Sequence, residues 1–145
     1  MGGQEFESLG RSRGGFSTKI HCKVDALGNP LRIILSGGEK ADIKYAHALV
    51  NNEPCRHLLG DRGYDADQFR FFLRKNRITP VIPGRSNRIE EIRYDKNLYR
   101  KRNIIERLFG RMKNFRRLAT RYDKRARVFQ AFLTLFCIFK WLNIF

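Results

Sequence analysis

Alternation of apolar and polar positions near the start of the chain predicts two paired strands. At residues 18–24 apolar side chains recur at every second position, which is typical of a half-buried strand. A second apolar segment covers residues 31–35, and the Asp, Gly, Asn and Pro between the two segments are turn formers. The pattern therefore predicts an antiparallel hairpin.

The next segment combines helical and strand patterns. Asp42 is expected to cap a helix that runs to about Asn51, because apolar positions recur there at the spacing of one helical face. A short apolar strand at residues 57–60 follows and leads directly into Asp61. Asp65 and the Gln three residues later have the spacing of a capping box, which predicts a second helix.

The remainder of the chain is predicted to be mainly helical. A short strand at residues 79–83 and a charged loop at 84–93 precede a long helix at 95–119 and a last apolar helix at 124–143. The predicted order is strand, strand, helix, strand, helix, strand, helix, helix. This order indicates the α/β class, with helices covering a mixed sheet.

Composition adds a polyanion as the expected partner. Lys and Arg number 30 against 14 Asp and Glu, a formal net charge of +16. Such an excess repels itself in a compact molecule, and nucleic acid neutralises it through phosphate contacts. The three cysteines lack the spacing of a zinc site or a disulfide framework, which fits a reducing cytosol. The last apolar segment contains polar interruptions and is too short for a membrane span.

Asp61 is the first candidate for chemistry. It lies at the carboxyl end of a predicted strand, where α/β sheets commonly place functional groups, and Gly63 permits a tight turn that exposes the carboxylate. A turn residue without a chemical role fits the same position equally well. Position alone therefore leaves both interpretations open.

A second candidate lies on the predicted long helix. Tyr99, Arg102, Glu106 and Lys113 are separated by three, four and seven residues, so at about 100° per residue their directions fall within about 60° of one another. Glu106 is the only acidic residue between Tyr99 and Thr120. The alternative is a solvated helix with an intrahelical Arg–Glu pair, which stabilises by only a few tenths of a kcal/mol.

The same four residues resemble the Y-(2)-R-(3)-E-(6)-K signature of the DDE transposases of bacterial insertion sequences. Further blocks resemble, in the same order, segments of the short, insertion-sequence-five-like branch of this family; they are residues 10–21 (GRSRGGFSTKIH), the hairpin turn 25–30 (DALGNP), 61–65 (DRGYD) and 116–124 (RRLATRYDK). The resemblance covers nearly the whole chain from residue 10 onward.

The resemblance implies a ribonuclease-H-like fold, in which helices flank a mixed sheet. It also implies that Asp61 and Glu106 are two of three catalytic acids, which hold Mg²⁺ or Mn²⁺ during phosphodiester chemistry; hard cations of this kind prefer oxygen ligands. Arg102 and Lys113 would contact phosphate, and Tyr99 would pack or hydrogen-bond near the scissile bond.

DNA is the implied partner, both as the terminal repeats of an insertion sequence and as the target. Twelve Lys and Arg lie between Tyr99 and Arg127, and this basic ridge is expected to contact phosphates without reading bases. Beyond the signature, the expected DNA-binding residues are Arg116, Arg117, Arg121 and Lys124. The resemblance further implies a homo-oligomer acting in the bacterial cytoplasm, associated with the nucleoid when bound, and no membrane.

One part of the family pattern has no counterpart in the sequence. The first of the three acids lies, in the family, on a strand upstream of the block that begins at Gly10. Glu5 and Glu7 fall in an expected flexible Gly/Arg-rich lead-in, residues 1–16, and Asp25 belongs to the hairpin turn, so none is assigned that role. Residues 17–145 are therefore expected to form a partial catalytic domain that lacks its central first strand.

Two functions follow from this departure. The first is a transposase that is inactive alone and is completed by frameshifting or by a separate upstream polypeptide; a decayed element is the third possible origin. The alternative function is a non-catalytic DNA-binding remnant or an inhibitor of transposition. A small basic RNA-binding or ribosomal protein is a weaker hypothesis, because it would not explain the Tyr–Arg–Glu–Lys signature.

Overall fold

The chain folds into two compact units. The computed structural model describes residues 7–12, 15–50 and 54–145. Unit 1 comprises Met1–Lys40 and Ile104–Phe145, and unit 2 comprises Ala41–Asn103. Glu5 and the expected helix end at Asn51 lie outside the described residues.

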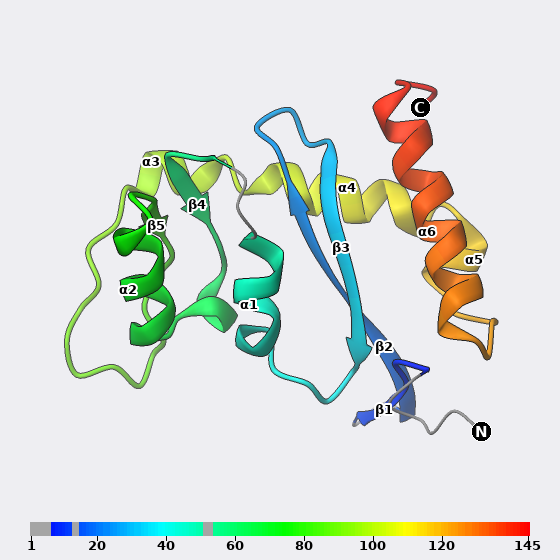
Figure 1. The fold of residues 1–145 in the computed structure, drawn as a ribbon, viewed down its shortest axis with the longest axis horizontal. Coiled ribbons are helices and arrows are strands. Elements are labelled where there is room, and N and C mark those ends of the chain that lie inside the picture. Colours follow the sequence, from blue (N-terminus) through cyan, green and yellow to red (C-terminus); the bar gives the residue numbers. More distant parts are fainter. Residues whose placement is uncertain (1–6, 13–14, 51–53) are drawn as a thin grey trace. The chain divides into compact units, whose positions relative to one another are not determined.

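Unit 1 is a three-stranded antiparallel sheet with helices (Figure 1). Its elements are β1 (Gly10–Ser12), β2 (Gly15–Val24), β3 (Pro30–Gly37), α4 (Asn103–Lys113, beginning one residue before the unit), α5 (Arg116–Ala119) and α6 (Ala126–Trp141). The predicted hairpin is confirmed: β2 pairs with β3 from Thr18 opposite Gly37 to Val24 opposite Pro30. Strand β1 was not predicted; it lies within the expected lead-in and pairs with the start of β2.

The turn of the hairpin is fixed by one carboxylate. Asp25 Oδ1 accepts hydrogen bonds from the backbone N–H of Leu27 (2.9 Å) and of Asn29 (2.8 Å). Gly28 has a φ of +84°, a conformation that glycine adopts without the steric cost of a Cβ. The turn residues expected from the sequence therefore set the register of β2 and β3.

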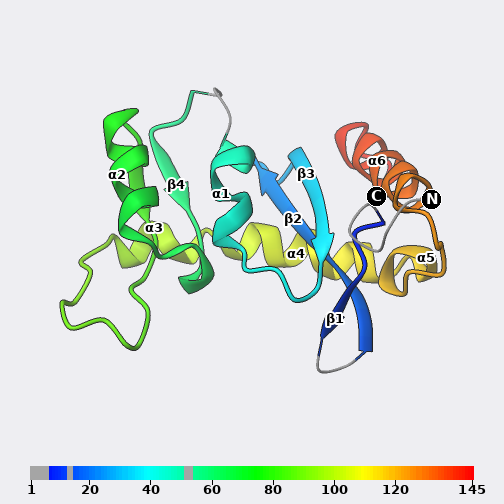
Figure 2. The ribbon, with the colours of Figure 1, turned by 60° about the horizontal axis from the view of Figure 1, so that its bottom comes forward.

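The core of unit 1 lies between the hairpin and the helices. The period-two apolar positions of the hairpin, including Ile20, Cys22 and Ile33, pack against the helices. The buried helical side chains of this core are Leu108 and Met112 of α4, Leu118 of α5, and Phe129, Leu133 and Phe136 of α6. Figure 2 shows α5 beside α6.

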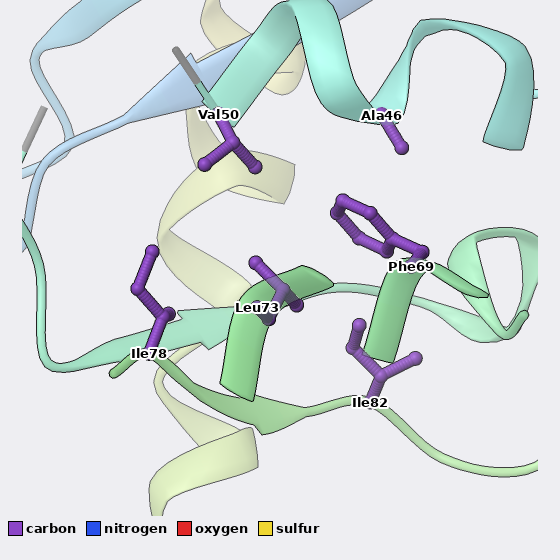
Figure 3. Packing of buried hydrophobic residues seen from close by; sticks show 6 residues of the cluster. All are labelled: Ala46, Val50, Phe69, Leu73, Ile78 and Ile82. Atoms are coloured by element: carbon purple, nitrogen blue, oxygen red, sulfur yellow. The ribbon is translucent and has the colours of Figure 1, made fainter. Parts of the chain in front are cut away.

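Unit 2 contains a two-stranded parallel sheet and three α-helices. Its elements are α1 (Ile43–Val50), β4 (His57–Leu59), the 3₁₀ turn η1 (Arg62–Tyr64), α2 (Asp67–Lys75), β5 (Thr79–Val81) and α3 (Lys96–Arg100). Its core is formed by six side chains, which Figure 3 shows converging from α1, α2 and the segment around β5: Ala46, Val50, Phe69, Leu73, Ile78 and Ile82. The helical and strand patterns predicted for this segment are confirmed.

Two details of the prediction were wrong. The long helix expected at 95–119 is interrupted at Lys101–Arg102 and again at Asn114–Phe115. At the first break, the amides of Lys101 and Arg102 bond to carbonyls three residues back, which is the pattern of a tight turn. At the second, Phe115 leaves helical geometry, and its ring packs on Phe136 with 5.4 Å between centroids. Tertiary packing here overrides helical propensity.

The capping box expected at Asp65 is also wrong. The residue that precedes α2 is Ala66, which makes no side-chain cap hydrogen bond. Asp65 instead points into a buried ion cluster described below. The described strands form one antiparallel sheet in unit 1 and one parallel sheet in unit 2. The mixed sheet with a missing central strand stays a prediction.

Candidate active site

Asp61 lies in an exposed turn directly after the parallel sheet of unit 2. The β4–β5 ladder extends to Gly60, whose N–H donates to Val81 O (3.3 Å). Asp61 then caps η1, and its Oδ1 accepts from Gly63 N at 2.8 Å. Its Oδ2 has no hydrogen-bond partner among the described residues. Directly after the strand, the Oδ2 atom of Asp61 is therefore unbonded within the described residues, on an exposed side chain.

A second carboxylate flanks the same glycine. A Cβ placed on Gly63 would come within 2.9 Å of both Asp61 Oδ1 and Asp42 Oδ2. A side chain at position 63 would therefore displace the carboxylate of Asp42, which precedes α1, or that of Asp61. The sequence indicated Gly63 as a turn former but gave no sign of the proximity of Asp42.

Behind this turn, a buried ion cluster ties it to the following loop. Asp65, whose side chain is 0% exposed, accepts hydrogen bonds from Arg70 Nε (2.8 Å), Arg88 Nε (2.7 Å) and the backbone N–H of Arg85 (2.7 Å). Arg88 also bonds to Asp67 Oδ1 at 2.6 Å. Loop 84–93 was expected to be a charged loop, and in the structure its arginine at position 88 is held by two carboxylates.

The cluster keeps Asp65 ionised. Burial alone would favour the neutral acid, but hydrogen bonds from Arg88, from Arg85 N and from Arg70 outweigh it and lower the pKa of Asp65 to about 2. Arg85 extends the connection, because its guanidinium lies 3.3 Å from the carbonyl oxygens of Arg62 and Gly63 in the Asp61 turn. One signal of this cluster was present in the sequence: Arg70 interrupts the apolar face of α2.

Glu106 belongs to unit 1 and lies in the first turn of α4. The sequence predicted that Glu106 lies in the middle of a longer helix. In the structure a new helix begins at Asn103, so Glu106 lies near a helix N-terminus, where the helix dipole stabilises a negative side chain. Glu106 and Lys113, both exposed, are two turns apart on this one helix. The side-chain directions calculated for the signature on one ideal helix therefore hold only for Glu106 and Lys113.

Tyr99 lies before the break and Arg102 lies within it, and both belong to unit 2. The guanidinium carbon of Arg102 lies 5.5 Å from the centre of the Tyr99 ring, within the range of a cation–π contact. The Tyr99 ring also packs edge-on against Tyr94, with 5.4 Å between centroids. Tyr99 thus supports the arginine next to it.

The predicted DNA-binding residues of unit 1 fall into two groups. Arg116, Arg117 and Lys124 are exposed, although Arg117 lies 4.3 Å above the Phe132 ring and 3.4 Å from Asp123 Oδ1. Arg121 is different, because every nitrogen of its guanidinium donates to a protein acceptor.

The partners of Arg121 join distant parts of the chain. Its Nη1 donates to Glu7 O (2.7 Å) and to Thr18 Oγ1, and its Nε donates to Asp123 O (2.8 Å). Burial lowers its pKa, and the charges of Glu7 and Asp123 oppose that shift. Glu7 in turn accepts from the N–H of Ala126, the first residue of α6. This contact network leaves Arg121 little capacity for phosphate.

Within the described residues, the structure contains neither a ready-made cluster of metal ligands nor a helix that could cross a membrane. No group of three or more His, Cys, Asp or Glu side chains within the described part of the chain is arranged to hold a metal ion. In the same residues, no helix has the length and apolar character that crossing a membrane requires. Asp61 and Glu106 each contribute hard oxygen atoms, the donor type that Mg²⁺ prefers.

Sequence comparison identifies relatives along almost the whole chain. The family model of the transposase DDE domain matches residues 5–140. The candidate transposase for insertion sequence element IS6501 of Brucella ovis is 36% identical over 129 residues, which cover 88% of this chain and 99% of that protein. The candidate transposase for element IS402 of Burkholderia cepacia is 34% identical over 139 residues, 88% of this chain and 63% of that protein.

No solved structure matches the chain. The family model, however, spans both units and includes Asp61, Glu106 and the basic residues that follow. Together with relatives more than 30% identical, this match confirms the resemblance inferred from the sequence. The chain belongs to the family of transposases with a DDE domain.

Proposed function

We propose that this transposase binds the ends of an insertion sequence and takes part in their cleavage and strand transfer, with Asp61 and Glu106 as two metal-binding carboxylates. The exposed Asp61 carboxylate at the end of the β4–β5 ladder is the observation that carries this assignment. A divalent cation, when bound, would activate the attacking hydroxyl and stabilise the leaving oxygen. A DNA partner also places the protein in the bacterial cytoplasm.

The protein's own residues would supply binding and orientation. Arg102, stacked on Tyr99, and the exposed Lys113, Arg116, Arg117 and Lys124 offer cations for phosphate. Phosphate contacts hold the duplex in register without reading its sequence. The Arg85 and Arg88 contacts fix the turn that carries Asp61, so that its free oxygen keeps one position.

The third carboxylate of the site is proposed to be neither Glu7 nor Asp25. Glu7 accepts a hydrogen bond from the start of α6, and Asp25 is engaged by the amides of its own turn. Both acids thus have structural roles, which supports their exclusion as the first acid of the family. A strand and an acid supplied by a preceding segment or another polypeptide would complete the site.

Metal binding and DNA chemistry test this proposal separately. Mn²⁺ binding, followed by electron paramagnetic resonance, should weaken at least tenfold in Asp61→Asn and in Glu106→Gln, and should be unchanged in Glu90→Gln, which changes an exposed acid of the same unit as Asp61. With terminal-repeat DNA, residues 1–145 alone should bind the duplex and leave it uncut. Cleavage should require the completing segment, Mg²⁺ and Glu106.

Two results would contradict the proposal. Mg²⁺-dependent cleavage that survives Asp61→Asn would remove this carboxylate from the site. DNA binding without any effect of metal, even with the completing segment present, would favour the alternative function, an inhibitor of transposition.

A further inference from the structure

Positively charged side chains gather at one end of the parallel sheet of unit 2. Strands β4 and β5 begin side by side, with His57 opposite Thr79, and the N–H of Thr79 donates to Arg56 O (2.8 Å). Helix α2 packs beside β5 and ends at Lys75, so the chain turns back there to begin β5 (Figure 1). Four exposed cations lie at this end and are called the amino-end cluster: Arg56, Arg74, Lys75 and Arg77.

The side chains of the amino-end cluster are not engaged by the fold. Among the described residues, no ion pair, side-chain hydrogen bond or ring contact involves any of the four. Other arginines of the same unit are bound within it: Arg70 and Arg88 by Asp65, and Arg85 by backbone carbonyl oxygens. The fold of unit 2 therefore engages these three arginines and leaves the amino-end cluster in solvent.

Little negative charge surrounds the amino-end cluster. No acidic residue occurs at positions 54–60 or 68–89 of the sequence. Glu53 lies outside the described residues and would offset one of the four positive charges. Like charges gathered at one end of a unit repel one another, and a polyanion that binds there removes this repulsion.

The backbone of Arg77 is a second, independent indication of a role outside the fold. Its φ is +60°, in the left-handed region that glycine occupies without steric cost. Arg77 follows Asn76, the cap of α2, and glycine is the usual residue at this place after a helix. Glycine would therefore suit the fold better than arginine. A residue kept in a strained conformation supports a hypothesis of function for its side chain.

The dipole of α2 explains only part of the amino-end cluster. Positive charge is favourable at the C-terminal end of a helix, and Arg74 and Lys75 lie in the last turn of α2. This effect falls off beyond the last turn. Arg56 belongs to another segment, directly before β4, so the dipole gives no reason for its charge.

The amino-end cluster and Asp61 lie at opposite ends of the same sheet. Arg56 precedes β4, and Asp61 follows the carboxyl end of that strand. The five residue steps between them span about 16 Å, at about 3.3 Å per residue of a strand. A phosphate bound by the cluster is therefore a different one from any phosphate held at Asp61.

We infer that the amino-end cluster is a second DNA-contact surface of this transposase, which binds backbone phosphates away from the scissile bond. The inference rests on the proposed function for DNA as the polyanion, but it uses neither the metal-binding carboxylates nor the basic ridge. Phosphate contacts carry no base information, so the contact should depend neither on DNA sequence nor on metal.

DNA titrations of residues 1–145 in EDTA, followed by fluorescence anisotropy, test this surface. Arg56→Gln combined with Arg77→Gln should weaken binding to a random-sequence duplex about tenfold. The slope of log affinity against log salt should fall by about 2, because two phosphate contacts are lost. The matched control combines Lys44→Gln with Arg93→Gln, which removes two charges from exposed positions of unit 2 outside the cluster. The control pair should leave both the affinity and the slope nearly unchanged.

Arg77→Gly separates DNA binding from folding. Glycine relieves the strain of the positive φ, so the urea concentration at the unfolding midpoint should rise. The loss of the guanidinium should at the same time weaken DNA binding. A purely structural role for Arg77 would instead lower the unfolding midpoint, and that result would overturn the assignment of Arg77.

The remaining outcomes distinguish this inference from the proposed function. If the wild-type chain binds no duplex at low salt, both are wrong. If Arg56→Gln with Arg77→Gln binds DNA as tightly as the wild type, only the second surface is wrong. Equal weakening by the control pair would show that net charge, and not the amino-end cluster, determines affinity. Weaker binding of polyglutamate with unchanged binding of DNA would assign the cluster to an acidic protein instead.

Discussion

Two aspartates four residues apart show how position in the fold separates residues of the same type. Asp61 is exposed and keeps one carboxylate oxygen free of described partners, whereas the side chain of Asp65 is fully buried among arginines. A carboxylate on the surface is available to a ligand, and one that is buried and paired stabilises the structure around it. The two acids of the block at residues 61–65 are therefore expected to fail in different ways when changed.

Asp65→Asn should destabilise the protein by about 3–5 kcal/mol, because removing one partner leaves a buried charge, Arg70, without compensation. Asp67→Asn, which removes only the 81% exposed partner of Arg88, should cost no more than about 1 kcal/mol. Urea unfolding followed by circular dichroism measures both. Equal effects of the two substitutions would show that Asp65 is not the centre of the cluster.

The difference in unfolding free energy between the wild-type protein and Asp65→Asn is predicted to depend on pH. The folded-state pKa of Asp65 is about 2, below its unfolded value of about 3.9. Its ionised form therefore stabilises the fold above the unfolded pKa, and this contribution is lost as the pH falls toward 2. The difference in unfolding free energy between the wild type and Asp65→Asn should be constant above about pH 5 and shrink below it.

Arg116 and Arg121 should separate DNA binding from folding. Arg116→Ala should weaken DNA binding roughly uniformly across sequences and reduce the slope of log affinity against log salt by about 1, with no change in stability. Arg121→Ala should destabilise the protein by about 1–3 kcal/mol, because it breaks the bonds to Glu7 and Thr18. Fluorescence anisotropy at several salt concentrations and urea unfolding distinguish the two. Loss of DNA affinity without loss of stability in Arg121→Ala would show that Arg121 contacts phosphate as part of the basic ridge.

At the scale of elements, apolar periodicity was a reliable guide where one face of an element packs on a core. The hairpin β2–β3 and helices α1 and α2 follow their predicted patterns. The prediction of one helix at 95–119 was wrong, because apolar spacing does not reveal a local turn. Its breaks depend on the bonds of Lys101 and Arg102 and on the packing of Phe115.

Helix α2 offers a direct test of the core in Figure 3. Leu73→Ala should cost about 2–5 kcal/mol, because Leu73 is 0% exposed and its removal leaves a cavity among Val50, Ile78 and Ile82. Phe71→Ala on the same helix should cost far less, since that ring is 69% exposed. Chemical denaturation of the two variants compares them on one element. Similar losses would place the core on the wrong face of α2.

At the scale of the whole molecule, net charge is the dominant property. A charge of +16 on 145 residues opposes compaction, and dissolved salt screens that repulsion. Raising NaCl from about 0.05 to 0.5 M should therefore raise the thermal unfolding midpoint. The same salt should weaken DNA binding steeply, because each phosphate contact releases counterions. Differential scanning fluorimetry and DNA titrations in the same buffers measure the opposed trends; a DNA affinity that does not change with salt would contradict the phosphate contacts.

The sequence by itself determined the α/β class, the order of most elements, the polyanionic partner and the family, because periodicity, charge and motif spacing are local properties of a chain. It also located Asp61 at a strand end, which the structure confirms. Only the tertiary structure decided that Asp65 is buried among arginines, that Glu106 lies in the first turn of a helix, and that Arg121 is hydrogen-bonded within the protein. The position of Glu106 depends on a local turn at Lys101 and Arg102 that apolar spacing does not reveal. The environments of Asp65 and Arg121 depend on contacts between residues far apart in the chain, such as Arg121 with Glu7, which no local pattern encodes.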